Sequence, residues 1–169
     1  MDDRDGGQTL AAVTMSVSIR RPPDVLWDMA SDVAMWPRFL RSVRGSRLIS
    51  SNEYHLTTRQ GTVVLRTRFD RDRLLLDHLL VLPVRSPFHY ACRLVPNYHG
   101  SELVASVIMR PREADSHFRR RVSLLQEAFD DLRHVAEGPL EAYSGYDGTL
   151  PAQVMPPRRG DQPPISVRR

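Results

Sequence analysis

The order of apolar and polar residues near the start of the chain predicts a strand followed by two short helices. Residues 14–20, TMSVSIR, alternate apolar and polar side chains, which is typical of a strand with one buried face. Two prolines end this strand, and the second, Pro23, suits the first turn of a helix over residues 23–30. A second short helix is expected over residues 34–43, where Pro37 is tolerated only near the helix start.

Six further segments have the alternation and the length of strands. Short connections rich in Gly, Pro, Asn and Asp separate them, which is the pattern of an antiparallel meander. These segments cover residues 46–50, 53–59, 62–69, 73–82, 88–95 and 102–110.

Residues 115–137 carry a long amphipathic pattern. Apolar residues return at alternating steps of four and three, which places them on one face of a helix. Because such a face must be removed from water, the helix is expected to pack on the sheet. These positions are Phe118, Val122, Leu125, Phe129, Leu132 and Ala136.

This order of elements predicts an α+β fold with helices on one face of a single antiparallel sheet. The predicted domain spans residues 13–137. Residues 1–12 are polar and are expected to be flexible, as are residues 138–169, which hold six of the 13 prolines. If the sheet curls around the long helix, a cavity remains between them, and the two short helices close one end.

Composition narrows the classes of function. The 169 residues are 41% hydrophobic and 26% charged, which is ordinary for one globular domain. No apolar run approaches the roughly 18–20 residues of a membrane-spanning helix. The polar N-terminus and the single cysteine, Cys92, indicate a protein of the reducing cytoplasm without an internal disulfide.

All 24 basic residues are arginines, and the net charge is +4, so lysine-based covalent chemistry is excluded. The arginines are scattered and are not interleaved with aromatic residues, which disfavours nucleic-acid binding; a partner for the basic tail is a weaker alternative. The six histidines show no metal-site spacing with carboxylates or Cys92, and no phosphate loop, nucleotide-binding or serine-elbow motif is found. No metal or cofactor is expected.

Alternation also selects polar side chains that could face the cavity. His78, rather than Asp77, shares a face with the leucines of residues 73–82, and an imidazole there could move protons. The alternative is a histidine satisfied by hydrogen bonds at the sheet edge or in a dimer contact. Tyr90 shares a face with Phe88, so its hydroxyl is expected to reach the cavity or a buried partner.

Two segments resemble a known family: SIRRPPDVLWDMASDVAMWPRFLRSV, residues 18–43, and SPFHYACRLVPNYHGSELVASVIMRP, residues 86–111. They are similar to the START/Bet v 1-like helix-grip superfamily, and in particular to the single-domain aromatic polyketide aromatase/cyclases of the tetracenomycin type. The resemblance covers about residues 14–137. It implies a curved seven-stranded antiparallel sheet wrapped around a long C-terminal helix, with two short helices after the first strand and a deep apolar cavity.

The resemblance further implies a polyketide cyclase. Such an enzyme receives a poly-β-ketone from an acyl carrier protein and promotes aldol ring closure, with or without dehydration, using no cofactor. Non-catalytic binding or transport of a lipid, a quinone or another hydrophobic small molecule is the alternative, and a homodimer is compatible with either. Val43 stands where these cyclases carry a tyrosine, which opposes first-ring aromatase activity.

These cyclases carry a functional arginine near the end of the strand that corresponds here to residues 62–69. Arg68 is the nearest match and Arg66 the second, and either could stabilise an enolate. Alternation opposes this assignment, because the apolar residues of the strand occupy the other face, so that only a bulge would turn the arginines inward. The candidate catalytic residues are Arg68, Arg66, His78 and Tyr90. The candidate substrate-binding residues are Trp36, Leu40, Tyr54, Arg59, Leu65, Thr67, Phe69 and Phe88.

Overall fold

The computed structural model describes residues 9–82 and 85–138. Seven strands, three α-helices and one 3-10 helix follow one another in these residues. In chain order they are β1 (Ala12–Ile19), α1 (Pro23–Ser31), the 3-10 helix η1 (Val33–Met35), α2 (Trp36–Phe39), β2 (Val43–Ser50), β3 (Glu53–Thr58), β4 (Gly61–Asp70), β5 (Leu75–Leu82), β6 (Arg85–Asn97), β7 (Gly100–Ile108) and α3 (Asp115–Glu137).

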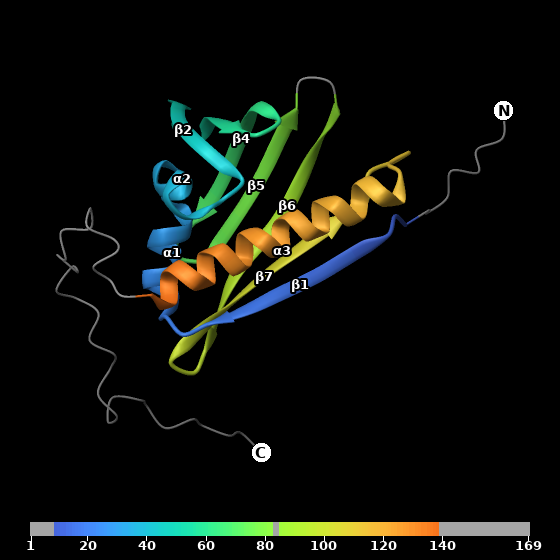
Figure 1. Cartoon of the computed structure of the whole chain (residues 1–169). Helices are drawn as coiled ribbons and strands as arrows, with labels where there is room; N and C mark the ends of the chain where they lie inside the picture. Colours follow the sequence, from blue (N-terminus) through green and yellow to red (C-terminus); the bar gives the residue numbers. More distant parts are fainter. Residues whose placement is uncertain (1–8, 83–84, 139–169) are drawn as a thin grey trace, which may run out of the picture. The chain divides into compact units, whose positions relative to one another are not determined.

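The seven strands form one antiparallel sheet in the order β1-β7-β6-β5-β4-β3-β2. Consecutive strands from β2 to β7 are neighbours, as a meander requires, while β1 pairs with β7. The segment α1–η1–α2 therefore carries the chain from one edge strand to the other. β5 is the middle strand of the sheet. The predicted helix-grip architecture is confirmed (Figure 1).

Helix α3 lies across the concave side of the sheet, over β7 and β1, while α2 packs against β2 and α1 contacts β5, β6 and β7 (Figure 1). The predicted apolar face of α3 is buried at five of its six positions, and Val122 is half-buried. The buried positions are Phe118, Leu125, Phe129, Leu132 and Ala136. One further residue on this face, Arg121, is also buried.

The second short helix is shorter than predicted. Asp32 accepts a hydrogen bond from the Ala34 amide at 3.2 Å and starts η1, and α2 then runs only to Phe39. Leu40 is extended, with ψ of 108°, so the helix cannot continue and β2 begins early, at Val43. The residues expected at the end of a helix thus form the start of a strand.

Two strand boundaries differ for local reasons. β5 begins at Leu75, because Leu74 has a φ of 53°, which is incompatible with a strand. β6 begins at Arg85, before Pro87, whereas the expected segment began at residue 88. The register between β5 and β6 shifts beyond Leu80, and such an irregularity can accommodate a proline that has no amide hydrogen to donate.

One corner of the fold joins three distant segments. A Cβ atom at Gly100 would lie 2.5 Å from the Ile19 carbonyl oxygen, so only glycine fits there. The Ser101 hydroxyl donates a hydrogen bond of 2.7 Å to the Arg21 carbonyl. The Arg21 side chain in turn donates to the carbonyls of Ala136 and Gly138 at the end of α3. The start of α1, the β6–β7 hairpin and the end of α3 are therefore tied together.

No helix in residues 9–82 and 85–138 has the length and the apolar character needed to cross a membrane. The expected flexible N-terminus and tail lie outside the described residues, apart from residues 9–12 and 138.

Candidate functional site

The inner face of the central strands presents two rows of cross-strand neighbours. Thr67, His78 and Tyr90 are direct partners on β4, β5 and β6. Tyr54, Leu65, Leu80 and Phe88 form the adjacent inner row on β3 to β6. Alternation along the strands predicted this facing, and the structure confirms it for both rows.

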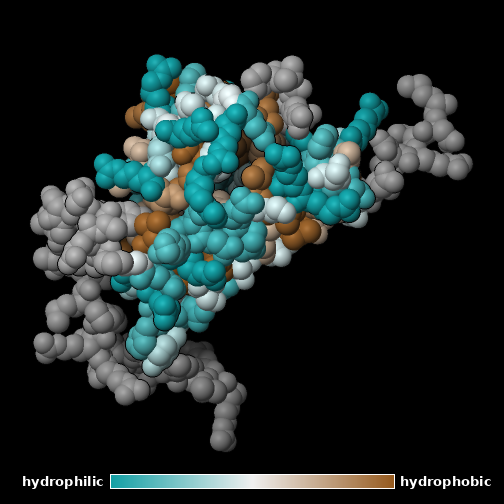
Figure 2. All heavy atoms as spheres, in the orientation of Figure 1, coloured by the Kyte–Doolittle hydropathy of each residue, from teal (hydrophilic) through white to brown (hydrophobic). Residues whose placement is uncertain are grey.

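A recess borders this inner face. Several of its side chains remain half-buried although they lie on the core side, which a fully packed interior would enclose. Figure 2 shows this view of the molecule hollowed above α3, with apolar atoms inside the hollow. The half-buried inner residues are Tyr54, Thr67, Phe69, His78, Leu80 and Phe88.

His78 stands at the centre of the recess wall. It lies on the middle strand, its Nδ1 atom is enclosed, and that atom has no hydrogen-bond partner. Burial lowers the pKa of His78 to about 4, so the imidazole is neutral at physiological pH. The sheet-edge position in the alternative reading of His78 is wrong, because β5 is the middle strand; a dimer contact stays an alternative.

Four rings form a continuous aromatic row along this wall: Phe88, Tyr90, His78 and Trp36. Their successive ring centroids are 5.4, 6.3 and 5.5 Å apart. The Trp36 indole nitrogen donates a 3.0 Å hydrogen bond to the Ala30 carbonyl, which fixes the ring at the end of the row. The short helices thus place Trp36 against His78.

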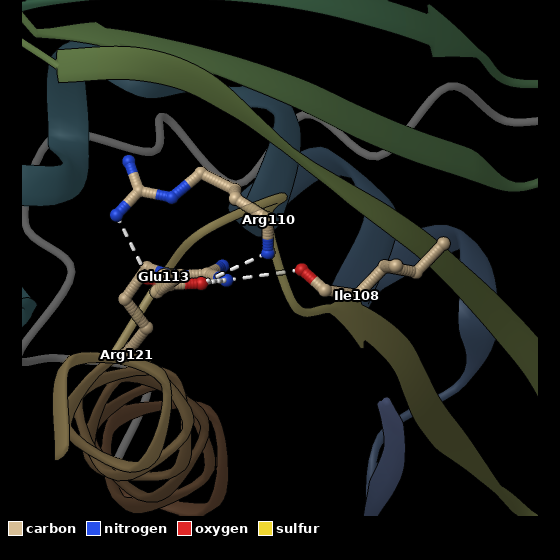
Figure 3. A network of polar contacts seen from close by, with 4 residues as sticks. All are labelled: Ile108, Arg110, Glu113 and Arg121. Carbon is tan, nitrogen blue, oxygen red and sulfur yellow. Dashed lines mark hydrogen bonds and ion pairs between the residues drawn. The ribbon is translucent and has the colours of Figure 1, made fainter. Parts of the chain in front are cut away.

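Three charged side chains gather beside the Phe88 end of this row (Figure 3). Glu113 accepts hydrogen bonds from Arg121 Nε at 2.9 Å and Nη2 at 2.7 Å, and from Arg110 Nη2 at 2.7 Å. Arg121 Nη2 also donates to the Ile108 carbonyl at 3.0 Å. The hydrogen bonds from Arg121 lower the pKa of Glu113 to about 2, so this carboxylate is ionised at neutral pH.

The Arg121 guanidinium connects this cluster to the aromatic row. Its central carbon lies 5.1 Å from the Phe88 ring centroid and 5.6 Å from that of Phe118. Burial raises the pKa of Tyr90 to about 12, while the nearby Arg121 charge acts in the opposite direction. Tyr90 therefore keeps its proton at neutral pH and can donate a hydrogen bond to a ligand oxygen.

The arginines suggested by the family resemblance do not enter the recess. Arg66 and Arg68 lie on the outer face of β4, and Arg66 Nε contacts Glu53 at 2.8 Å. The β4–β5 register runs without a shift from Val64 to Asp70, so no bulge turns these side chains inward. Arg59 is exposed in the turn after β3. The expectation that these three arginines face the ligand is wrong, because strand alternation turns Arg66 and Arg68 outward and Arg59 lies in an exposed turn.

The remaining candidates lie on the inner side. Leu65 is fully buried, and Phe69 packs beside His78 with ring centroids 6.1 Å apart. Leu40 follows α2 and packs against the core. Within the part of the chain that the structure describes, no three His, Cys, Asp or Glu side chains converge as a metal site would require.

Arg121 is not among the site residues predicted from the sequence. A signal was present, because Arg121 follows Phe118 by three positions and precedes Leu125 by four, which places it on the buried stripe. An arginine on such a stripe needs a buried acceptor, and Glu113 comes from the turn before the helix. Local periodicity does not show that pairing.

Known proteins resemble this chain in part of the sequence and in the fold. Residues 19–100 match the family described as polyketide cyclase / dehydrase and lipid transport. A START superfamily protein from Mycobacterium smegmatis aligns with a TM-score of 0.64 at 12% identity, over 75% of this chain and 97% of that one. No curated protein matches the sequence.

Two other solved structures show the same fold. An uncharacterised protein from Bacillus thuringiensis aligns with a TM-score of 0.65 at 15% identity, covering 75% of this chain and 98% of that chain. The Zhui aromatase/cyclase from Streptomyces sp. R1128 aligns with a TM-score of 0.61 at 12% identity, covering 76% and 94% respectively.

Proposed function

We propose that this protein, a helix-grip chain of the START/Bet v 1-like superfamily, binds a poly-β-ketone in its recess and promotes aldol ring closure. The observation that supports this most directly is the placement of His78. It is a neutral imidazole on the middle strand whose Nδ1 atom has no hydrogen-bond partner, and it lies among aromatic rings at the border of the recess. An apolar residue would stabilise the core better at this position, because an unpaired buried polar atom costs free energy.

The chemistry needs one proton acceptor and one donor. His78 accepts a proton from the methylene carbon between two ketones, and the enolate carbon then attacks a second ketone to form the new C–C bond. The alkoxide produced takes a proton from Tyr90, and the proton held by the imidazolium restores the Tyr90 hydroxyl. Atoms and charge balance without a cofactor.

The walls supply orientation and exclude water. Trp36, Phe69 and Phe88 are large apolar surfaces that hold a flexible chain in one folded shape, so that the reacting carbons meet. A poly-β-ketone also cyclises without a protein. The identity of the main product therefore shows whether the shape of the recess directs the ring closure.

Delivery by an acyl carrier protein is part of this proposal. The net charge of +4 complements an acidic carrier protein, which predicts that association weakens as salt concentration rises.

The test is reconstitution with a carrier-bound poly-β-ketone and analysis of the products by liquid chromatography and mass spectrometry. Wild-type protein is expected to direct the chain to one cyclised product. His78→Ala and Tyr90→Phe are each expected to reduce the rate of that closure by about 100-fold. His89→Ala is the matched control, because His89 is exposed on the outer face of β6 and should leave the rate unchanged.

Carriage of a hydrophobic ligand without chemistry is the second candidate. The outward facing of Arg66 and Arg68 favours it, because the inner face of β4 then offers no cation for an enolate. A product distribution identical with and without the protein, together with retained binding of the polyketide, would establish carriage and overturn cyclisation.

A further inference from the structure

Arg121 holds donors that its structural contacts do not use. A guanidinium has five N–H donors, and the contacts to Glu113 and to the Ile108 carbonyl occupy the Nε and Nη2 atoms. The remaining nitrogen, Nη1, is enclosed and has no hydrogen-bond partner. The whole side chain is only 8% exposed, so water does not readily take the place of a partner.

The ion pair alone does not account for this free nitrogen. Glu113, which Arg110 shares, contacts the other two nitrogens of Arg121, and the Ile108 carbonyl completes that edge. A buried donor without an acceptor costs free energy, and a permanently charged group makes the cost larger. An acceptor at Nη1 would remove this cost.

The surroundings of the guanidinium indicate where that acceptor comes from. The Phe88 and Phe118 rings flank the guanidinium, and the Tyr90 hydroxyl lies beside it, where both the charge and the hydrogen-bonding capacity of Arg121 lower the pKa of Tyr90 against the larger effect of burial. Phe88 and Tyr90 belong to the aromatic row that borders the recess. The free Nη1 donor of Arg121 therefore lies next to the aromatic row that borders the recess, and not at the solvent-exposed surface.

We infer that Arg121, with the Tyr90 hydroxyl beside it, binds an acidic oxygen at one end of the hydrophobic ligand. This inference rests on the proposed function and deepens it by naming the ligand class: an apolar body that carries a carboxylate, phenolate or enolate oxygen. Because Nη1 is enclosed, the oxygen reaches it when the half-buried Phe88 side chain moves aside. Arg121 then lies at the acidic end of the ligand, while His78 lies along its apolar body.

The experiment compares two probes of the same shape on the full-length chain. 2-Naphthoate carries the acidic oxygen, and 2-naphthalenemethanol lacks the charge. Isothermal titration calorimetry at pH 7.5 is expected to show naphthoate binding at least about tenfold more tightly, since charge-assisted hydrogen bonds are the stronger ones. Arg121→Lys keeps a cation for Glu113 but loses the planar fork, and should abolish this preference while leaving the alcohol's affinity unchanged.

Arg120→Lys is the matched control, because Arg120 is the preceding residue and is exposed; it should keep the preference. Equal affinity of wild-type protein for both probes, or a preference that survives in Arg121→Lys, overturns the inference and leaves the proposed function intact. If neither probe binds the wild-type protein, the proposed function fails and this inference fails with it.

A measurement on wild-type protein covers the case in which Arg121→Lys does not fold. In a ¹⁵N spectrum of the arginine Nε–H groups, naphthoate should shift the Arg121 signal and the alcohol should not. A signal that does not respond to naphthoate overturns the inference.

Discussion

Arg121 on α3 and Glu113 in the turn after β7 form a nearly solvent-free ion pair, with side chains 8% and 1% exposed. The pair fastens the start of the long helix to the end of the last strand. The turn and the helix come together only on folding. The ion pair therefore couples the formation of the sheet to the packing of α3 on it.

Removing one partner of this pair should be far more harmful than removing both. Arg121→Met removes two hydrogen bonds from the buried Glu113 carboxylate and leaves Arg110 as its remaining cation, so we expect the free energy of unfolding to fall by about 3 kcal/mol. The double variant Arg121→Met with Glu113→Gln should recover part of this loss. Urea denaturation of both variants measures the difference, and a double variant no more stable than the single one would contradict the account.

An exposed ion pair gives the control for that experiment. Arg133 and Asp130 are 46% and 42% exposed and contact each other at 3.0 Å on the surface of α3. Arg133→Met should change the free energy of unfolding by less than about 1 kcal/mol.

The burial of His78 predicts a loss of stability at mildly acidic pH. Burial lowers the pKa of His78 to about 4 in the fold from the ordinary value of 6.5, so below pH 6.5 the unfolded chain binds a proton that the folded protein does not. Stability should therefore fall between pH 6.5 and 4, by about 3 kcal/mol in total. His78→Leu should flatten this part of the pH profile, whereas His89→Leu should not. Equilibrium unfolding at a series of pH values is the measurement.

The close approach at Gly100 predicts a large effect from one methyl group. Gly100→Ala would place Cβ 2.5 Å from the Ile19 carbonyl, so either β1 or the β6–β7 hairpin must move. We expect a fall in the free energy of unfolding of about 2–4 kcal/mol. Gly45→Ala serves as the comparison, because the nearest atoms there are 3.6 Å away. Equal melting temperatures for the two variants would contradict this reading.

Cys92 should be chemically silent in the native protein. The side chain is 2% exposed, and burial raises the pKa of the thiol to about 12. Since the thiolate is the reactive form, a disulfide reagent such as dithionitrobenzoate should react with the denatured protein and not with the native one. Fast stoichiometric labelling of the native chain would show that the β6 region opens.

Arg66 and Arg68, on the outer face of β4, should not be needed for ligand binding. Arg66→Ala removes an exposed contact with Glu53, so the free energy of unfolding should change by less than about 1 kcal/mol. Affinity for 2-naphthoate should stay within a factor of two. A much larger loss of affinity would mean that β4 presents its other face to the ligand in solution.

Strand alternation carried much of the information about the site. It placed Leu65, His78 and Tyr90 on one face and Arg66 and Arg68 on the other, because a period of two holds wherever the register has no shift. The family resemblance pointed to the two arginines instead. For Arg66 and Arg68, strand alternation predicted the correct face and the family resemblance did not.

The interior charges could not be predicted in the same way. Arg121 lies on the helical stripe, but its burial depends on Glu113, which lies outside the helix and is oriented by a turn. The end of α2 likewise depends on the extended conformation of Leu40, which composition does not reveal. Both features arise from tertiary contacts between segments with no shared local pattern.

His78 lies on β5, the middle strand, whereas β1 and β2 are the edge strands, which open most easily. Three strands flank β5 on each side, so fraying of β1 or β2 breaks edge hydrogen bonds and leaves those of β5 in place. Amide hydrogens of β5 should accordingly be among the last to exchange with deuterium, and those of β2 among the first.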